Sequence, residues 1–254
     1  MDLTFLRFDT LTSTNTEAAE RARRGAGEGL VVVARQQTAG KGRYGRVWIS
    51  EPGAGLYLSV VLRPEMEPRR LPFITLMAGL AVYDTLKKLG LEVDIKWAND
   101  VLAREKKISG ILAETVDTPA GLAVVLGIGI NLVSTSFPHE IAATATSIEA
   151  ELLSTDRGAA VPSSDALERL LLMTIGRWYN ALNAPDGCQK LIRAWKKRSS
   201  YTKGKHVRIH LNDRAIVGTT DGLADDGALR IRQADGSVTI VHAGDVERIR
   251  SIGD

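Results

Sequence analysis

The sequence predicts an α+β protein in which one large domain of helices and strands is followed by a small all-β domain. Up to about residue 201, segments with apolar residues at helical spacing alternate with short β-branched segments. After Lys203, short strand-like segments recur at even spacing and are separated by turn residues. We therefore expect a sheet with packed helices over residues 1–201 and a β-barrel over residues 202–254.

The first half of the large domain alternates between helix and strand signals. Thr14 to Glu17 fits a capping box, with a hydroxyl at the N-cap and a glutamate three residues later. The chain then predicts a helix over 17–24, a buried strand over 30–38, a glycine-rich loop over 39–48, strands over 47–50 and 55–63 separated by a turn over 51–55, and a long packed helix over 70–90.

After residue 90, strand and helix signals again follow one another along the chain. Strand character appears over 93–100, 107–116 and 122–132, with a hairpin turn at 117–121. Helices are expected over 163–182, capped by Ser163 or Ser164, and over 188–199. The small domain should contain strands over 206–211, 215–220, 228–233 and 238–249, separated by turns at 212–214, 224–227 and 234–237.

The composition excludes several classes of protein. The 254 residues are 44% hydrophobic and 25% charged, as in an ordinary globular protein, and the longest apolar runs are too short to span a bilayer. The N-terminus shows no secretory signal. A single cysteine, Cys188, excludes an internal disulfide, and the four scattered histidines lack the spacing of a zinc enzyme. We expect a cytoplasmic protein without a transition-metal centre or membrane contact.

The charge is unevenly distributed. The net charge is only +3, but the stretch from Lys190 to Arg208 holds eight basic residues and no acidic one. A nucleic-acid site usually interleaves aromatic residues for stacking, and this stretch offers only Trp195 and Tyr201. A solvated helix face followed by a linker is therefore the favoured interpretation.

The glycine-rich loop has the sequence AGKGRYGRVW. Gly40, Gly42 and Gly45 have the spacing of a dinucleotide-binding turn, but a helix does not follow them and no terminal GK[ST] is present, so neither a Rossmann nor a Walker loop is predicted. Glycines let the backbone approach a ligand, and the loop adds three cations, Lys41, Arg43 and Arg46. We expect a loop that is mobile when empty and becomes ordered around a polyphosphate.

Four further segments place polar groups in otherwise apolar strands: STN at 13–15, KWAND at 96–100, KISGIL at 107–112 and GIGIN at 127–131. Burying Lys96, Lys107 or Asn131 alone would cost several kcal/mol without a partner. Repeated use of this arrangement predicts a shared polar pocket.

In order along nearly the whole chain, STN, QTAGKGRYGRVW, KWAND, KISGILAE and GIGIN resemble the biotin–protein ligases, also called biotin–[acetyl-CoA-carboxylase] ligases. The resemblance implies a mixed β-sheet of the class II synthetase-like biotin–lipoate ligase fold and an SH3-like C-terminal β-barrel. The family usually has proline where Ala98 stands and arginine where Lys41 and Tyr44 stand. Because Lys41 lacks the guanidinium fork, we expect it to hold phosphate more loosely.

The resemblance implies a two-step reaction. The biotin carboxylate attacks the α-phosphate of MgATP and forms biotinyl-5′-AMP, and a lysine of a biotin carboxyl carrier domain then takes the biotin. Lys107, Arg43 and Lys41 would act at the reacting centre, where cations offset the repulsion between two anions. Asp100 matches a position proposed to orient or deprotonate the acceptor lysine, although a turn role competes with this one. Magnesium would be held mainly by the phosphates, not by protein ligands.

Binding roles also follow from the resemblance. The expected biotin contacts are Ser13, Thr14, Asn15, Gln37, Gly40, Arg43, Lys107 and Gly110. The expected ATP contacts are Lys41, Arg43, Arg46, Trp48, Lys107 and Asn131, with Arg46 toward the β- and γ-phosphates and Trp48 and Asn131 near adenine. A helix cap competes with the ligand role of Thr14, and a core aromatic role competes with that of Trp48. Glu114 could face the pocket or lie at a strand edge.

The sequence also bears on binding partners and on alternative functions. Some relatives carry an N-terminal DNA-binding domain, but STN begins at residue 13, so we expect no DNA binding. A homodimer through an exposed sheet edge is possible. The closest rival function is lipoate or octanoate transfer by the same fold. Two more distant rivals are a nucleic-acid-binding module and a protein that binds biotin without catalysis.

Overall fold

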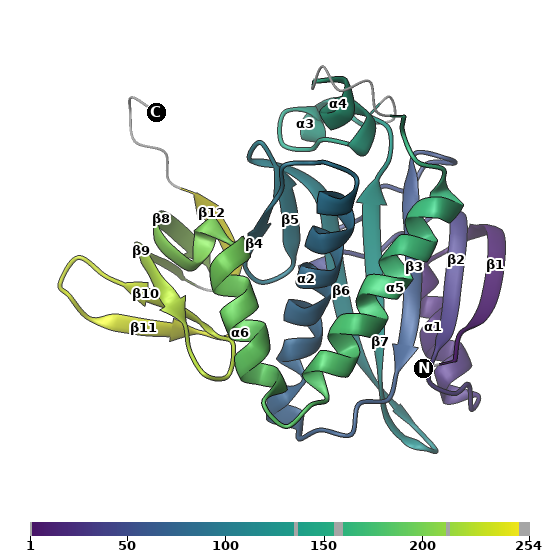
Figure 1. Ribbon diagram of the computed structural model, residues 1–254, viewed down its shortest axis with the longest axis horizontal. Coiled ribbons are helices and arrows are strands. Elements are labelled where there is room, and N and C mark those ends of the chain that lie inside the picture. Colours follow the sequence, from purple (N-terminus) through teal and green to yellow (C-terminus); the bar gives the residue numbers. More distant parts are fainter. Residues whose placement is uncertain (1, 135–136, 155–159, 212–213, 249–254) are drawn as a thin grey trace.

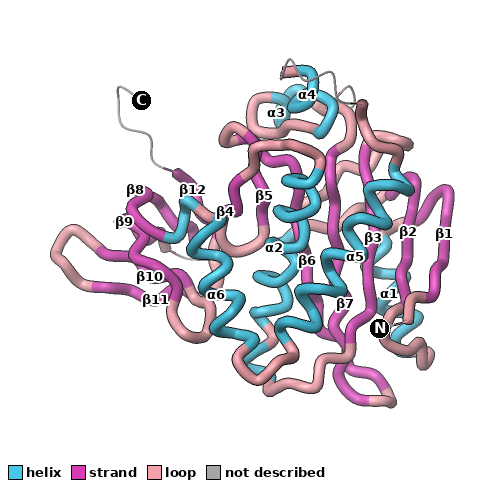
Figure 2. The backbone as a smooth tube through the Cα atoms, in the orientation of Figure 1, coloured by secondary structure: helices cyan, strands magenta, loops and turns pink. Residues whose placement is uncertain are grey.

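The computed structural model describes residues 2–134, 137–154, 160–211 and 214–248. Figure 1 shows a large sheet with helices on both faces and a smaller β domain beside α6, at the end of the molecule opposite β1. Figure 2 shows the same arrangement coloured by secondary structure. The predicted fold class, an α+β domain with a mixed sheet plus a small C-terminal β domain, is confirmed.

Within the described residues, the large sheet has seven strands in the order β1-β2-β3-β7-β6-β5-β4. β1 and β2 are parallel and the remaining neighbours are antiparallel. The strands are β1 (Thr4–Leu11), β2 (Leu30–Gln37), β3 (Gly55–Leu62), β4 (Asp94–Lys96), β5 (Asp100–Ala103), β6 (Lys106–Thr118) and β7 (Gly121–Asn131). Central β3 is buried along its whole length because helices cover both faces of the sheet.

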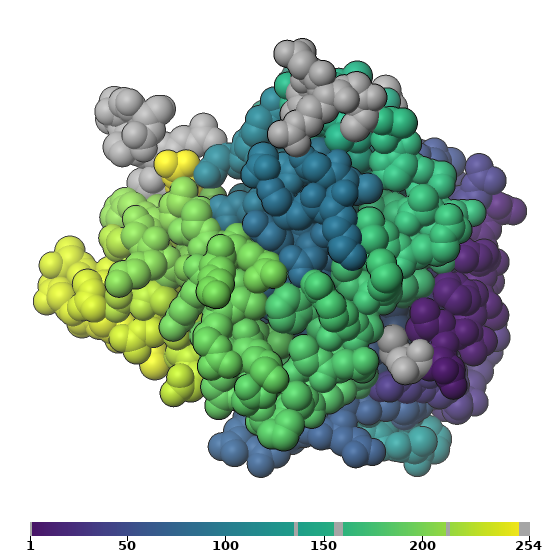
Figure 3. Space-filling view, in the orientation of Figure 1, coloured from purple at the N-terminus to yellow at the C-terminus, as the bar shows by residue number. Residues whose placement is uncertain are grey.

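Three helices cover one face of the sheet: α2 (Pro72–Lys88), α5 (Ser164–Leu182) and α6 (Gly187–Arg198). In Figure 3 their side chains cover the middle of the sheet, while the purple N-terminal edge stays in view. α2 is apolar around most of its circumference because it packs against the sheet, α5 and α6 together. On the other face α1 (Thr14–Arg23) buries Ala18 and Ala22 against a smaller apolar cluster. Short helices α3 (His139–Ala142) and α4 (Ile148–Leu153) follow β7.

The C-terminal domain is a five-stranded antiparallel sheet within the described residues, in the order β11-β10-β9-β8-β12. Its strands are β8 (Lys203–His210), β9 (Ala215–Leu223), β10 (Leu229–Arg232), β11 (Val238–Val241) and β12 (Asp245–Arg248). The domain packs on the large one through its 224–228 turn: the Trp97 indole donates to the Gly227 carbonyl at 3.1 Å, and Gly227 lies against Leu76 of α2. Parts of the predicted turn at 212–214 and of the 238–249 segment lie outside the described residues.

Several local predictions are wrong. The N-cap of α1 is Ser13 rather than Thr14, and the Thr14 hydroxyl lies against Gln37 instead of capping the helix. Glu17 pairs with Arg21 one turn later, so the capping box is not formed. Residues 47–50 do not form a strand; Val47 and Ser50 make only isolated bridges to Lys41 and Gln37.

The sequence does not predict β1, β5, α3 or α4. The strand predicted over 93–100 is limited to β4, and the segment predicted as one strand over 238–249 contains two strands, β11 and β12. β1 lies at the edge of the sheet and is mostly exposed or half-buried, so its apolar residues do not alternate cleanly. α3 and α4 are too short for helical periodicity to show. Among the described residues, every helix is too short or too polar to cross a membrane.

Candidate functional site

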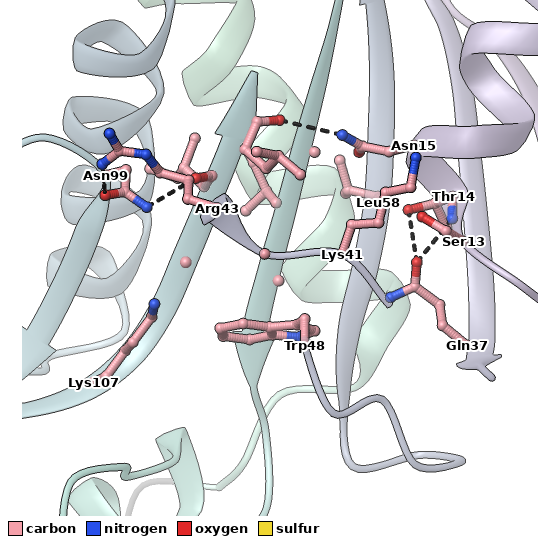
Figure 4. A pocket seen from close by; sticks show the side chains of 17 residues that line it. Ser13, Thr14, Asn15, Gln37, Lys41, Arg43, Trp48, Leu58, Asn99 and Lys107 are labelled. Atoms are coloured by element: carbon pink, nitrogen blue, oxygen red, sulfur yellow. Dashed lines mark hydrogen bonds between the residues drawn. The ribbon is translucent and has the colours of Figure 1, made fainter. Parts of the chain in front are cut away.

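A cleft opens over the face of the sheet that carries α1, and it holds about 450 Å³ of empty space, part of it open to solvent. In Figure 4, Ser13, Thr14, Asn15 and Gln37 lie at one end, Lys107, Arg43 and Asn99 at the other, and the Trp48 indole between them. The lining residues are Ser13, Thr14, Asn15, Gln37, Lys41, Gly42, Arg43, Trp48, Leu58, Asn99, Lys107, Gly110, Ile111, Leu112, Gly127, Ile128 and Gly129. Lys41 lies between the Trp48 indole and Thr14. One end is thus polar, with the ammonium of Lys41 beside it, and the other carries the cations Arg43 and Lys107.

The polar end is held by the start of α1. Thr14 donates its backbone N–H to Gln37 Oε1 at 2.8 Å, and its hydroxyl lies 3.1 Å from the same oxygen. Gln37 Nε2 donates to Ser50 Oγ at 2.7 Å, and Ser50 donates to the Trp48 carbonyl at 3.1 Å. The end of β2 and the strand-like stretch after the loop are therefore tied to the helix N-terminus, where the amides favour acceptor groups.

Behind the polar end lies a second, buried set of contacts. Ser59, in the middle of β3 and fully buried, has its hydroxyl 2.6 Å from Asn15 Oδ1 and 2.8 Å from Thr14 Oγ1. Asn15 Nδ2 donates to Glu114 Oε2 at 2.7 Å. Neither Ser59 nor Glu114 lines the cleft. Behind the polar end, therefore, lie buried polar groups whose hydrogen bonds determine how Thr14 and Asn15 face the cleft.

Glycines make the floor of the cleft. Gly110 of β6 and Gly129 of β7 are cross-strand partners, and a Cβ at either position would lie 2.7 Å or 2.4 Å from atoms of the Trp48 indole. A Cβ at Gly127 would lie 2.0 Å from Asn15 Oδ1. The glycines of KISGIL and GIGIN thus leave room for Trp48 and Asn15 to lie flat on the sheet. Trp48 Nε1 is buried and donates to no protein group among the described residues.

The loop over 40–48 folds back on itself. The Trp48 N–H donates to the Gly40 carbonyl at 2.8 Å, and the Gly42 N–H donates to the Arg46 carbonyl at 2.7 Å. Tyr44 and Gly45 at the tip have left-handed φ of 55° and 73°. A Cβ at Gly40 would lie 2.3 Å from the Trp48 carbonyl, so this close crossing requires glycine.

Two arginines tie the loop to other parts of the chain. Arg43 Nη1 donates to Asn99 Oδ1 at 2.8 Å and to the Gly244 carbonyl at 3.5 Å, and Asn99 in turn donates to the Ile111 carbonyl. Arg46 forms an ion pair of 2.5 Å with Asp245 of β12. The C-terminal domain therefore contacts the loop directly, and Arg46 points toward that domain.

At the cationic end, two lysines share one carboxylate. Lys107 Nζ lies 2.7 Å from Asp100 Oδ1 and Lys96 Nζ lies 3.5 Å from Asp100 Oδ2. The shorter contact is a close ion pair, and it is the stronger of the two interactions with the carboxylate. Burial raises the pKa of Asp100, but the positive charges of Lys107 and Lys96 outweigh it, so the pKa lies below its ordinary value. Asp100 is therefore an anion whose neighbours are cations.

Most of the residues expected to bind ligands meet in this cleft: Ser13, Thr14, Asn15, Gln37, Lys41, Arg43, Trp48, Lys107 and Gly110 all line it. Four expected residues do not. Gly40 supports the loop, Arg46 pairs with Asp245, and Asp100 lies behind Lys107. Asn131 donates to the Thr146 carbonyl at 2.9 Å, so here its amide holds the segment before α4. The ligand roles of all these residues stay predictions.

Sequence reasoning missed some lining residues. Asn99 lies within KWAND and Gly127, Ile128 and Gly129 within GIGIN, so the motifs contained them, but periodicity alone does not show which members face a ligand. Ser59, which lies behind the cleft rather than lining it, has the weakest sequence signal: it is a single serine in the apolar segment GLYLSVVL. Among the described residues, histidine, cysteine and carboxylate side chains form no cluster of three that could hold a metal ion.

Two family models match the chain. The Biotin/lipoate A/B protein ligase family matches residues 6–131, and the Biotin protein ligase C terminal domain matches residues 202–248.

Several named proteins are also similar to it. A biotin–[acetyl-CoA-carboxylase] ligase of Mycobacterium tuberculosis is 35% identical, over 94% of this chain and 86% of the relative. The bifunctional ligase/repressor BirA of Bacillus subtilis is 33% identical, over 94% of this chain and 72% of the relative. The solved structure of biotin protein ligase from Aquifex aeolicus in complex with biotin and ATP superposes with a TM-score of 0.82 at 27% identity, covering 97% of this chain and 99% of that one.

Proposed function

Because the chain belongs to the biotin/lipoate A/B protein ligase family, we propose that it activates biotin with ATP and transfers it to a lysine of a biotin carboxyl carrier domain. The observation that carries this proposal is the two-ended cleft. Its polar end, formed by Ser13, Thr14, Asn15 and Gln37, suits an uncharged polar head group such as the ureido ring of biotin. Its other end carries Arg43 and Lys107, which suit a carboxylate meeting a phosphate, and Lys41 lies nearer the polar end.

The first half-reaction joins two anions that repel each other. The carboxylate oxygen of biotin attacks the α-phosphorus of ATP, the bond to pyrophosphate breaks, and biotinyl-5′-AMP remains. Lys107 and Arg43 are held in advance by Asp100 and Asn99, so their charges are positioned before the substrates arrive. Such preorganised charge is usually the largest single contribution to catalysis.

In the second half-reaction the ε-amine of the carrier lysine attacks the carbonyl carbon of the mixed anhydride, and AMP leaves. Of the two roles considered for Asp100, orientation is the better supported. A carboxylate whose pKa lies below its ordinary value accepts hydrogen bonds well but takes up a proton poorly. Asp100 would therefore hold Lys107, and then the incoming amine, without acting as the base.

Magnesium, when bound with ATP, would neutralise phosphate charge. The carboxylates nearest the cleft are already engaged, since Asp100 faces Lys96 and Lys107 and Glu114 accepts from Asn15. We therefore propose that the phosphates hold the metal. We also propose a domain boundary at residue 201, a cytoplasmic location, no DNA binding and a homodimer.

A coupled assay on the full chain tests the function. With biotin, MgATP and a carrier domain, we expect pyrophosphate release that depends on biotin, together with a mass increase of the carrier equal to one biotinyl group. Lipoate and octanoate, the acids of the rival function, should give at most background release. Efficient transfer of either acid with no transfer of biotin would overturn the proposal in favour of the rival.

A further inference from the structure

The polar end of the cleft contains a continuous chain of hydrogen-bonding groups whose directions can be deduced. It runs from Glu114 through Asn15, Ser59 and Thr14 to Gln37. Each carboxylate or carbonyl oxygen only accepts, each amide nitrogen only donates, and each hydroxyl has one proton to donate. Fixed acceptors at both ends limit the possible proton arrangements, and the lengths of the contacts then select one of them.

The amide of Asn15 has only one possible orientation. Its amino group faces the Glu114 carboxylate at 2.7 Å and the Leu112 carbonyl at 3.4 Å, and both of these only accept. Its oxygen must then face Ser59. Gln37 is fixed in the same way at the opposite end: its amino group donates to Ser50 Oγ, and its oxygen already accepts the Thr14 N–H.

Between these two amides the number of protons is one too few. Three oxygen–oxygen contacts lie in a row: Asn15 Oδ1 to Ser59 Oγ at 2.6 Å, Ser59 Oγ to Thr14 Oγ1 at 2.8 Å, and Thr14 Oγ1 to Gln37 Oε1 at 3.1 Å. Only two hydroxyl protons are available for them. The two shortest contacts take the protons, so Ser59 donates to Asn15 and Thr14 donates to Ser59.

The longest contact, between Thr14 Oγ1 and Gln37 Oε1, is then left without a proton. Both residues line the cleft, whereas Ser59 and Glu114 do not. Two acceptor oxygens at the cleft wall lack a hydroxyl proton between them, which is the arrangement that an N–H donor on a ligand would complete.

We propose that Ser59 and Glu114 are positioning residues that direct the hydrogen bonds of Thr14 inward, and so make the cleft specific for a head group with N–H donors. The inference rests on the proposed function, because the ureido ring of biotin has two N–H groups whereas the octanoyl chain and the dithiolane of lipoate have none. A site built to accept a donor discriminates strongly against analogues that lack it.

Replacing Ser59 by alanine tests this directly. In Ser59→Ala the Thr14 hydroxyl loses its acceptor and turns to donate to Gln37 Oε1. That oxygen already accepts the Thr14 N–H, so it then has no lone pair left for an N–H group of the ligand. We expect biotin to bind about 10- to 100-fold more weakly in calorimetry without ATP. The affinity for biotin methylated on both ureido nitrogens should fall less than about threefold on the same substitution, because this analogue has no N–H group to donate to the cleft wall.

Glu114→Gln provides a second variant that leaves the buried strand β3 untouched. A glutamine can donate to Asn15, so the Asn15 amide is free to turn over and give its amino group to Ser59. All later bonds then reverse, and Thr14 donates to Gln37. We expect about a three- to tenfold loss of biotin affinity, with little change for the methylated analogue and an unchanged KM for ATP.

Thr85→Val is the matched control. Thr85 is fully buried between α2 and α5 and its hydroxyl lies 2.7 Å from Thr174 Oγ1, away from the cleft, so the variant loses a buried hydroxyl without changing biotin affinity. Equal losses of affinity for biotin and for its methylated analogue, or unchanged biotin affinity in both variants, would overturn this inference but not the proposed function. A wild-type chain that binds octanoate and not biotin would overturn the proposed function with it.

Discussion

At the scale of single residues, the cleft works through charges that other side chains hold in place. Lys107 is the clearest case: its ammonium group faces Asp100 at 2.7 Å and lies 5.4 Å from the centre of the Trp48 ring. It is only partly exposed, so its charge is less screened than a surface lysine's. We propose that this arrangement stabilises negative charge at one point of the cleft.

We expect Lys107→Ala to slow biotinyl-adenylate formation by about 10²- to 10³-fold, since the loss of one preorganised donor to a developing charge has this size in other enzymes. The fold should be retained, because the side chain is partly exposed and α1, α2 and β3 do not depend on it. Stopped-flow pyrophosphate release measures the rate, and circular dichroism checks the fold. Turnover like that of the wild type would remove Lys107 from the mechanism.

The Asp100 carboxylate links the same site to pH. Its pKa in the folded protein lies below the ordinary value of 3.8, so the carboxylate stabilises the fold above that pH and loses this contribution as the pH falls through the folded pKa. In Asp100→Asn we expect unfolding free energy lower than that of the wild type by about 2 kcal/mol, constant from pH 8 to 5. Below about pH 4, urea titrations should show a smaller difference in unfolding free energy between the variant and the wild type. A difference that widened toward low pH would contradict the assigned ionisation.

At the scale of elements, paired glycines on adjacent strands create the space that the aromatic residue of the loop occupies. Gly110 and Gly129 face each other across β6 and β7, and Trp48 lies over both. GIGIN and KISGIL are thus parts of one surface, although 17 residues or more separate their glycines in the chain. The loop can fold back over the sheet only where neither strand has a Cβ.

Gly129→Ala should therefore displace Trp48, since the new Cβ would lie 2.4 Å from Cε2 of the indole. We expect biotin-dependent pyrophosphate release to fall by about 10-fold or more, because shifts of about 1 Å at an active site can cost that much. Gly176→Ala in α5 is the control: apart from the neighbouring backbone of its own helix, no described residue has an atom within 4 Å of that Cβ. Alanine should stabilise the helix by about 0.5–1 kcal/mol with unchanged activity. Equal activity in the two variants would show that Trp48 does not need its place on the glycines.

At the scale of the whole molecule, the C-terminal domain completes the wall that holds the loop. Arg46 pairs with Asp245, Arg43 reaches the Gly244 carbonyl, and Trp97 of KWAND donates to Gly227. The two parts of the chain that the family models match therefore contact each other at the loop and are not joined only by a linker. Since Arg46 is expected to reach the β- and γ-phosphates, ATP would have to compete with Asp245 for it.

Asp245→Ala should free the loop. The ion pair is largely exposed and contributes at most about 1 kcal/mol, so global stability should hardly change. We expect trypsin to cleave near Arg43 a few times faster in the empty variant than in the wild type, and biotin with ATP to protect both. Asp221→Ala, which breaks a pair with Arg232 inside the C-terminal domain, should leave the cleavage rate unchanged. Equal cleavage of all three proteins would show that Asp245 does not restrain the loop.

The parts of this architecture that the sequence predicts are those governed by periodicity and by motif. α2, α5 and α6, the buried strands β2, β3, β6 and β7 and the C-terminal β domain all have strong apolar patterns, whereas the four-residue β5 is too short to show one. β1 is not predicted because an edge strand with exposed positions has no clear alternation of apolar and polar residues. Residues 47–50 are wrongly predicted as a strand because they have strand-forming side chains but pair with no neighbouring strand. The direction of the Ser59 contacts depends on groups distant in the chain, which no local pattern contains.

The central claim is that one cleft unites biotin and ATP as an adenylate. Native mass spectrometry of the full chain after incubation with biotin, lipoate and octanoate together in the presence of MgATP tests it most directly. We predict a complex retaining biotinyl-5′-AMP alone, strongly reduced in Lys107→Ala. A retained lipoyl or octanoyl adenylate, or unreacted biotin and ATP bound side by side in the wild type, would contradict it.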